Sequence, residues 1–242
     1  MHGILKRRFK MQTKKKFRLE IEELIESEDL VGLLKKAGEL HGHHCNYLAY
    51  GVVAGLYGIR KLGVSNTGME EIIAIVETNN CFSDGVQMVT GCSFGNNALV
   101  YRDYGKTAVT ISKRDGKAIR LALNPKFEDL REGEYPEAYE MFNRLVAQRQ
   151  EGSPEDYAKL MTLFAEMSRK ELNTPVEKMF LIEEKEIEIP SFAPMFESVK
   201  CAKCRENVMK ARAVEKDGQY YCISCAKEAY FELNGSGISE RK

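Results

Sequence analysis

The sequence predicts an α+β protein, in which a core of mixed or antiparallel sheet is packed with helices and is followed by a small treble-clef or zinc-ribbon-like domain. Three observations predict this class. Apolar residues at helical spacing are interspersed with short β-branched runs, two Cys-x-x-Cys pairs lie near the C-terminus, and a proline-containing segment separates the two parts. The expected divisions are a basic tail (1–18), a core domain (19–190), a linker (191–199) and a zinc-finger domain (200–242).

The first part of the core is predicted to be helical. In residues 19–40, acidic residues alternate with Ile and Leu at helical spacing, which indicates two helices, the second capped by Ser27 or Asp29 and ending near Gly38. The apolar run 47–62 predicts a buried helix. Small residues recur in it at one-turn spacing and let another backbone pack closely: Gly51, Gly55 and Gly58.

The sheet is predicted from β-branched runs. Residues 71–77 predict a buried strand, followed by a polar loop (78–85), a short helix (86–89) and a small-residue loop (90–97). Three further strands are expected as an antiparallel meander, at 98–103, 107–112 and 118–123. Amphipathic patterns then predict helices over 135–150 and 154–171, with Ser153 as the N-cap of the second, and a strand over 178–189.

The C-terminal cysteines form the most specific motif. Cys201 and Cys204 are followed, after 17 residues, by Cys222 and Cys225, which is the spacing of a four-thiolate zinc site. An Asp217–Gly218 turn predicts a hairpin between the pairs, and a helix is expected from Cys225 through Leu233. About 45 residues bury too little apolar surface to fold alone, so structural zinc is expected to supply the folding energy. Docking or dimerisation is the favoured role for this domain, and nucleic-acid binding the alternative.

A second cluster lies at the start of the buried helix. The run 41–45 reads His-Gly-His-His-Cys and holds three of the four histidines of the chain. Histidine and cysteine are ligands of borderline and soft metals, and a helix N-terminus favours thiolate over thiol. The alternative is that these are structural side chains.

Two later cysteines, Cys81 and Cys92, lie in predicted loops of small polar residues, where catalytic groups often collect. A metal site with two or three ligands and an open position, a catalytic pattern, is expected from His41, His43, Cys45 and Cys81. Asp84 would orient a ligand, bind the metal or act as a general base. The alternative is that Cys81 and Cys92 are ordinary buried thiols.

Charge and cysteine usage indicate the environment. The 36 basic residues balance 36 acidic ones, so no polyelectrolyte partner is implied for the whole chain. The first 18 residues are basic, and a nucleic-acid or membrane-surface arm is the less favoured explanation. An odd number of cysteines, seven, without a signal peptide or membrane span favours the reducing cytoplasm.

Three motifs follow one another along the chain: His41-Gly42-His43-x-Cys45, Glu77-x-x-x-Cys81-x-x-Asp84-x-x-Gln87-x-x-Thr90-Gly91-Cys92-x-x-Gly95 and Asp103-Tyr104-Gly105-Lys106-x-Ala108. Taken together, they resemble the FmdE family, which is associated with formylmethanofuran dehydrogenase, and the resemblance covers about residues 35 to 190. The resemblance implies an α+β core, usually a homodimer, with a cleft lined by the His-Gly-His-x-Cys residues and the second Cys, in which some relatives hold metal. It also implies that the zinc finger is an appendage that many members carry. The family is named for the operon of a molybdenum or tungsten enzyme, and that name does not establish an activity.

The chain departs from the family pattern in three places. Asn46 replaces a usual Pro, Gly85 a usual Ala, and Asn96–Asn97 a Lys-Gly pair. The last change removes a positive charge from the expected site. Lys106 remains as an anion or substrate contact, or as a solvated lysine at a strand end.

Two functions are therefore kept open. In the first, the protein is an enzyme or redox-linked accessory with zinc or iron in the core site, where Asp84 handles protons and Cys92 supplies a further thiol. In the second, the core binds a ligand without catalysis, and the finger docks onto the components of a dehydrogenase complex. A nucleic-acid-binding regulator is less favoured than either.

Overall fold

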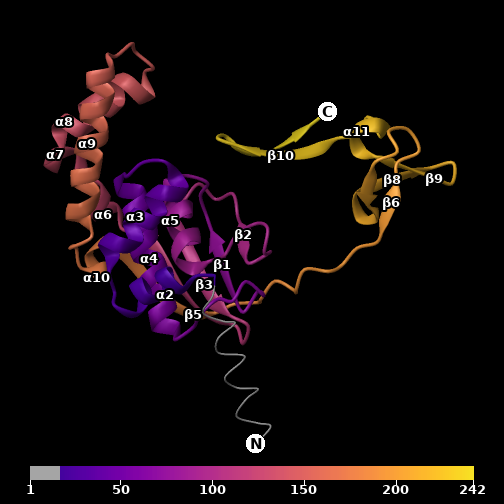
Figure 1. The fold of residues 1–242 in the computed structure, drawn as a ribbon, viewed down its shortest axis with the longest axis horizontal. Helices are drawn as coiled ribbons and strands as arrows, with labels where there is room; N and C mark the ends of the chain where they lie inside the picture. Colours follow the sequence, from indigo (N-terminus) through magenta and orange to yellow (C-terminus); the bar gives the residue numbers. More distant parts are fainter. Residues whose placement is uncertain (1–16) are drawn as a thin grey trace, which may run out of the picture. The chain divides into compact units, whose positions relative to one another are not determined.

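The computed structural model describes residues 17–242, so most of the predicted basic tail lies outside the described residues. The chain divides into two compact units, one that ends at Ile189 and one that spans Pro190–Lys242 (Figure 1). Each unit has its own secondary structure and its own group of candidate metal ligands.

The larger unit is built on a five-stranded sheet with the order β2-β1-β3-β4-β5. Its strands are β1 (Ile72–Val76), β2 (Leu99–Tyr101), β3 (Ala108–Lys113), β4 (Lys117–Leu123) and β5 (Phe180–Glu186). The sheet is mixed, because β2 runs parallel to β1 whereas β1, β3, β4 and β5 pair antiparallel. All five residues of β1 are buried. The predicted α+β class with a mixed sheet is confirmed.

The predicted three-stranded meander is wrong in one strand. β3 and β4 form the expected hairpin, but β2 lies on the far side of β1, where Ala74 faces Leu99. A helix connects β1 to β2, and this crossover lets β2 enter the sheet in the same direction as β1.

The N-terminal helices pack close to the sheet and to one another (Figure 1). They are α2 (Leu19–Glu26), α3 (Leu30–His41), α4 (Asn46–Leu62) and α5 (Cys81–Thr90). Asp29 caps α3 by accepting a hydrogen bond from the amide of Gly32, and α3 continues past Gly38 to His41. Most of α4 is buried, as its apolar sequence predicts.

Helix α5 begins earlier than predicted. Its first residue is Cys81 rather than Val86, because the side chain of Asn80 accepts a hydrogen bond from the amide of Phe82 and caps the helix. Residues 81–85 are therefore helical, and the prediction of a loop there is wrong.

Helices α4 and α5 contact each other backbone to backbone. A Cβ atom on Gly51 of α4 would overlap the carbonyl oxygen of Phe82, and one on Gly85 of α5 would overlap that of Leu48. The glycines of α4 thus allow the close approach that the sequence predicted. This approach brings the N-terminus of α5, with Cys81, toward the N-terminus of α4.

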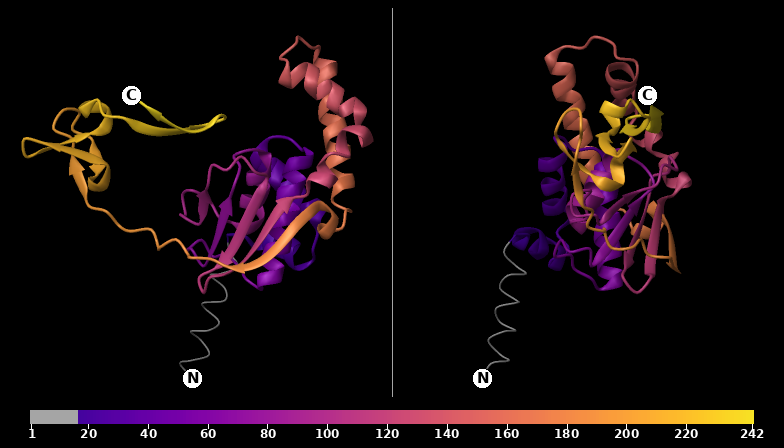
Figure 2. Two further views of the ribbon diagram at one scale, coloured as in Figure 1. Left: turned by 180° about the vertical axis from the view of Figure 1, so that it is seen from behind. Right: turned by 90° about the vertical axis from the view of Figure 1, so that its right-hand side faces the viewer.

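The remaining helices form a projecting layer that adjoins α4 (Figure 2). They are α6 (Pro125–Glu128), α7 (Arg131–Glu134), α8 (Pro136–Phe142), a π-helical turn (Asn143–Ala147), α9 (Pro154–Glu171) and α10 (Val176–Met179). The predicted helix 135–150 is therefore shorter and ends in the π-turn, whereas α9 has the predicted Ser153 cap. A buried ion pair between Arg131 and Glu171, at 2.8 Å, ties α7 to α9.

The smaller unit consists of three two-stranded antiparallel sheets and two short helical turns. Its elements are β6 (Ser198–Lys200), β7 (Asn207–Met209), a 3-10 turn (Lys210–Arg212), β8 (Ala213–Lys216), β9 (Gln219–Cys222), α11 (Ile223–Ala226), β10 (Tyr230–Asn234) and β11 (Gly237–Arg241). Asp217 and Gly218 form the predicted turn, both with positive φ. The predicted helix through Leu233 is wrong, because α11 stops at a left-handed Lys227 and a hairpin follows.

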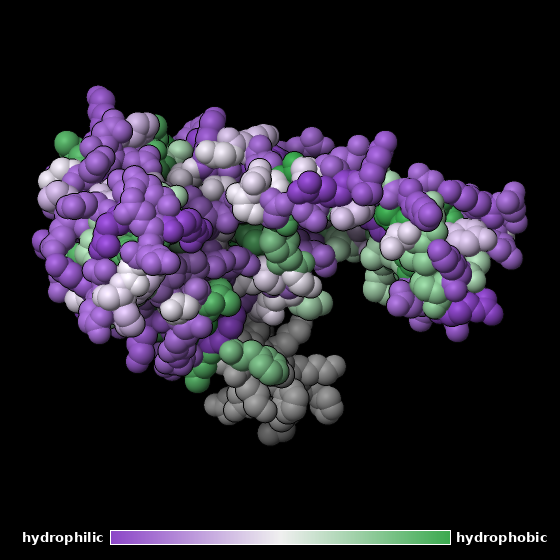
Figure 3. Space-filling view, turned by 90° about the horizontal axis from the view of Figure 1, so that it is seen from above, coloured by the Kyte–Doolittle hydropathy of each residue, from purple (hydrophilic) through white to green (hydrophobic). Residues whose placement is uncertain are grey.

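Hydrophilic side chains cover most of the visible face of the larger unit, with apolar ones interspersed (Figure 3). Scattered apolar side chains of this kind are normal on a protein surface. Among the described residues, no helix is both long enough and apolar enough to cross a membrane.

Candidate metal centre

Four predicted ligands converge at the ends of three helices. His41 ends α3, His43 lies in the turn after it, Cys45 caps α4 and Cys81 is the first residue of α5. One ligand atom from each lies within 4.8 Å of the others. A tetrahedral metal with bonds of about 2.0–2.3 Å places its ligand atoms roughly 3.3–3.8 Å apart. The spacing is therefore compatible with one ion after small side-chain adjustments.

The contacts of His41 favour metal binding most directly. Its Nδ1 atom lies 2.7 Å from Oδ2 of Asp84, whose other oxygen accepts a hydrogen bond from the side-chain amide of Gln87. The opposite ring atom, Nε2, is buried and has no hydrogen-bond partner among the described residues. A carboxylate that holds one ring nitrogen while the other faces a metal is a common arrangement in metal sites.

The electrostatics of His41 are set by opposing effects. Burial lowers the pKa of His41, but the hydrogen bond with Asp84 and the negative charge of Cys81 together raise it above its ordinary value. The contact of Asp84 with Nδ1 restricts the orientation of the ring, and of the three roles that the sequence left open for this carboxylate, it suits that of orienting a ligand.

The two cysteines form a coupled pair. A hydrogen bond from Cys45 is the main cause that lowers the pKa of Cys81 to about 6. The same interaction, together with burial, raises the pKa of Cys45. Of the two thiols, Cys81 is therefore the one that ionises more readily, and it lies at the N-terminus of α5, where the helix dipole favours a thiolate.

His43 faces a small cavity beside the four ligands. Burial lowers the pKa of His43, so its ring is neutral near pH 7. No hydrogen bond of this ring is found in the described part of the chain, although the ring lies 4.4 Å from that of His41 between centroids. A neutral ring without a fixed partner is available either to a metal or to a proton.

The cavity has a volume of about 280 Å³ and lies between the ligand group and helices α8 and α9. Three of the four candidate ligands line it, along with aromatic and amide side chains. The lining residues are His43, Cys45, Asn46, Tyr47, Asn80, Cys81, Tyr139, Phe142, Phe164 and Met167. The wall from α8 and α9 was not predicted from the sequence, because those residues follow an ordinary amphipathic pattern far along the chain.

Two other predicted site residues do not join this group. Cys92 follows the C-terminal end of α5, a helix of ten residues that spans about 15 Å. Its sulfur is buried beside the carbonyl of Ile72 and the amide of Asn66, and burial raises the pKa of Cys92 to about 11. Lys106 is exposed and does not line the cavity. The third histidine of the run, His44, packs against Gly38 of α3.

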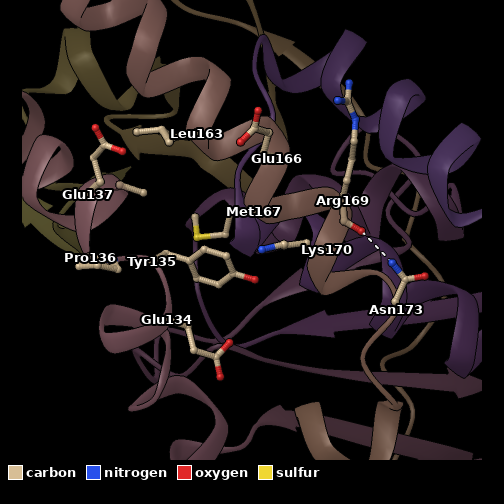
Figure 4. A pocket seen from close by; sticks show the side chains of 11 residues that line it. Glu134, Tyr135, Pro136, Glu137, Leu163, Glu166, Met167, Arg169, Lys170 and Asn173 are labelled. Carbon is tan, nitrogen blue, oxygen red and sulfur yellow. Dashed lines mark hydrogen bonds between the residues drawn. The ribbon is translucent and has the colours of Figure 1, made fainter.

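A larger cavity, of about 640 Å³, lies between the start of α8 and the face of α9 (Figure 4). Side chains of both charges line it, including Glu134, Glu166 and Lys170, and the ammonium of Lys170 lies 5.6 Å from the ring centre of Tyr135. Met167 borders both cavities. None of the residues singled out from the sequence lines this larger cavity.

The smaller unit contains the second ligand group. The four sulfur atoms of Cys201, Cys204, Cys222 and Cys225 lie within 4.8 Å of one another. The sulfurs of Cys204 and Cys222 are 3.9 Å apart, close to the separation of about 3.8 Å expected in a tetrahedral zinc–thiolate site. These residues therefore fit the predicted four-cysteine metal site.

The fold and the two ligand groups define a mixed α+β domain with a candidate His/Cys metal centre, joined to a small four-cysteine unit. A family model described as "FmdE, Molybdenum formylmethanofuran dehydrogenase operon" matches residues 40–181. The chain belongs to this family, as its motifs predicted.

Two similar proteins extend the comparison. A protein of Archaeoglobus fulgidus named "Probable S-adenosyl-L-methionine-binding protein" is 42% identical over 222 residues, which cover 90% of this chain and 58% of that protein. The chain thus spans less than two thirds of that relative. The crystal structure of a tungsten formylmethanofuran dehydrogenase FmdE-like protein from Syntrophus aciditrophicus matches with a TM-score of 0.53 and 19% identity, covering 81% of this chain and 91% of the other. This second likeness concerns the fold alone.

Proposed function

We propose that the larger unit binds one metal ion through His41, His43, Cys45 and Cys81, and presents it to a ligand in the adjoining cavity. Two observations carry the proposal. The Nε2 atom of His41 is buried and lacks a partner among the described residues, and one ligand atom from each of His41, His43, Cys45 and Cys81 lies within 4.8 Å of the others. Two nitrogens and two sulfurs suit zinc or iron.

The roles of the side chains follow from their positions. Asp84 holds the proton of His41 on Nδ1 and so leaves Nε2 free to bind. His43 stands at the cavity, as the fourth ligand or as a proton carrier once a ligand displaces it. A bound metal in such a setting supplies Lewis-acid polarisation or, for iron, redox capacity. The apolar wall limits access of water to this end of the cavity.

For the smaller unit we propose structural zinc held by Cys201, Cys204, Cys222 and Cys225. Of residues 190–242, only Cys201 and Gly237 are buried, so there is little apolar core to hold the fold together. Metal binding then supplies the missing stability.

We further propose that the protein acts in the cytoplasm as a homodimer associated with formylmethanofuran dehydrogenase-type metabolism, either with a reaction of its own or as an accessory component. Family membership supports this setting. Light scattering tests the dimer, and co-purification of dehydrogenase components through the C-terminal unit tests the accessory role.

S-adenosylmethionine binding is a second candidate, supported by the printed name of the 42% identical relative. The larger cavity offers carboxylates and a lysine beside an aromatic ring, which suit a ligand that carries both charges (Figure 4). Calorimetric titration with S-adenosylmethionine tests this function, and Lys170→Ala and Glu166→Gln variants should weaken the binding.

Metal content per chain, measured by elemental analysis on protein prepared without oxygen, tests the main proposal. We expect two metal ions per chain, one of which is lost in a Cys201→Ser/Cys204→Ser variant and the other in Cys45→Ser. One ion per chain, absent from the double variant and unaffected by Cys45→Ser, would leave the His/Cys group without a metal role.

A further inference from the structure

The cavity beside the candidate metal centre has an unusual distribution of polarity. None of the residues that line it is Lys, Arg, Asp or Glu, and its wall is almost wholly apolar. Phe142 and Phe164 stand together with a centroid separation of 6.0 Å, and Met167 and the tyrosine rings complete the wall.

The polar groups of this wall are already engaged within the protein. The hydroxyl of Tyr47 donates to Glu128. The side-chain amide of Asn46 lies 3.4 Å from the hydroxyl of Tyr50 and 3.5 Å from that of Tyr139. What these residues offer to the cavity is therefore mainly their apolar surface.

Asn80 is engaged in the same way. Its carbonyl oxygen caps α5, and its amide reaches the hydroxyl of Thr107 at 3.5 Å. The remaining polar lining is the candidate metal group itself: His43, Cys45 and Cys81. The cavity thus has one polar end and an apolar body.

The size of the cavity restricts the ligand further. An apolar protein cavity of ~150 Å³ is enough to bind benzene. A volume of about 280 Å³ therefore admits one six-membered ring with a short substituent. An ionised carboxylate or ammonium group in the body of the cavity would lose its hydration without gaining a partner.

We propose that this cavity binds a small neutral molecule with a ring-sized apolar body and a single polar group, such as a hydroxyl or carbonyl, directed at His43, Cys45 and Cys81. The inference rests on the proposed metal site for the identity of the polar end. The preference for a ligand with an apolar, uncharged body depends only on the residues that line the cavity wall.

The test compares two probes by fluorine NMR: 3-fluorobenzyl alcohol, which is neutral, and 3-fluoro-5-(hydroxymethyl)benzoate, which keeps the same hydroxymethyl group for the polar end and adds a carboxylate that must lie in the apolar body. Each is titrated with the full chain loaded with zinc. We expect saturable binding of the alcohol and an affinity for the benzoate that is lower by about tenfold or more. Absence of saturable binding by the alcohol, or equal affinities for the two probes, would overturn the inference.

A Phe142→Lys variant supplies the second arm. Phe142 is 37% exposed, so a lysine there can keep its charge hydrated and leave the fold intact, which circular dichroism checks. A cation in the wall should reverse the preference, so that the benzoate binds more tightly than the alcohol. Phe94→Lys, at a position that is 58% exposed and outside the cavity, is the matched control and should keep the original preference. An unchanged preference in Phe142→Lys would place the probes elsewhere and overturn the inference.

The failures of the two proposals are distinguishable, because metal content is measured on the same samples. A folded chain without core metal that still selects the alcohol contradicts the metal site and supports the apolar cavity. A metal-loaded chain that does not select the alcohol contradicts the cavity inference and leaves the metal site standing.

Discussion

At the scale of single residues, the contact between His41 and Asp84 organises the candidate centre. The carboxylate lies 2.7 Å from Nδ1 and favours a proton on that nitrogen, which leaves the buried Nε2 as the ring nitrogen available to a metal. Gln87 holds the second carboxylate oxygen from one turn further along α5. Gln87 therefore limits the rotation of the Asp84 side chain, and Asp84 limits the rotation of the His41 ring.

Replacement of Asp84 by Asn should weaken metal binding at the core site by about 10–100-fold. The uncharged amide of asparagine would neither raise the basicity of His41, as the carboxylate does, nor favour one tautomer of its ring. Competition with a metal indicator, on a chain that lacks Cys201 and Cys204, measures this affinity. The exposed residue Asp129, which lies outside the site, supplies the control Asp129→Asn. An affinity in Asp84→Asn equal to that of the control would show that the carboxylate does not support the site.

The sequence predicts the candidate metal ligands better than it predicts the residues that line the cavity beside them. His41, His43 and Cys45 are adjacent in the chain, and their residue types alone indicate metal binding. Phe142 and Phe164 are ordinary apolar positions in amphipathic helices, and only tertiary packing brings them to the site. Cys92, in contrast, was predicted to belong to the site because it shares a motif with Cys81. It lies buried at the far end of α5, away from the candidate ligands.

At the scale of secondary structure, the contact between α4 and α5 determines how close Cys45 and Cys81 lie. Gly51 and Gly85 let the two backbones touch. Because each cysteine is at the N-terminus of its helix, a change in helix separation changes the distance between the two sulfurs directly.

A Gly51→Ala variant should lose about 1–3 kcal/mol of unfolding free energy, because the added methyl group overlaps the carbonyl of Phe82 and forces the helices apart. Core metal affinity should fall with it. Chemical denaturation and metal competition measure the two effects.

Gly133→Ala is the control for this change. It lies in helix α7 with open space around its Cα, so it should be neutral or slightly stabilising. Equal stability and equal metal affinity of Gly51→Ala and Gly133→Ala would contradict this role of the contact between α4 and α5.

The start of α5 shows why element boundaries were harder to predict than element types. Residues 78–85 are mostly small or polar, which is typical of a loop, yet the cap by Asn80 starts a helix at Cys81. Likewise, the apolar character of Leu99–Tyr101 predicts a strand, but the direction in which it pairs depends on the path of α5. The second error concerns long-range geometry that local patterns do not encode, whereas the first comes from a local cap between Asn80 and Phe82 in a segment whose composition is typical of a loop.

At the scale of the whole molecule, the two units are stabilised by different means. The larger unit has a continuous apolar core around β1, α4 and α5. The smaller unit has almost none, and four cysteine sulfurs lie within 4.8 Å of one another in it instead. Their stabilities should therefore respond differently to removal of metal.

A strong chelator should unfold residues 198–241 while the sheet of the larger unit stays folded, because only the smaller unit depends on metal for its stability. Hydrogen exchange followed by mass spectrometry reports the two regions separately. We expect loss of protection in β6–β11 and retained protection in β1, β3 and β4. Loss of protection in both units at the same chelator concentration would contradict this division.

X-ray absorption at the metal edge tests the central claim, the core metal site, most directly. The Cys201→Ser/Cys204→Ser variant, loaded with one equivalent of zinc, leaves the His/Cys group as the intact site. We expect a coordination sphere of two sulfurs at about 2.3 Å and two nitrogens at about 2.0–2.1 Å, which an added Cys45→Ser change abolishes together with the bound zinc. A sphere of oxygen and nitrogen without sulfur, unaffected by Cys45→Ser, would contradict the core metal site.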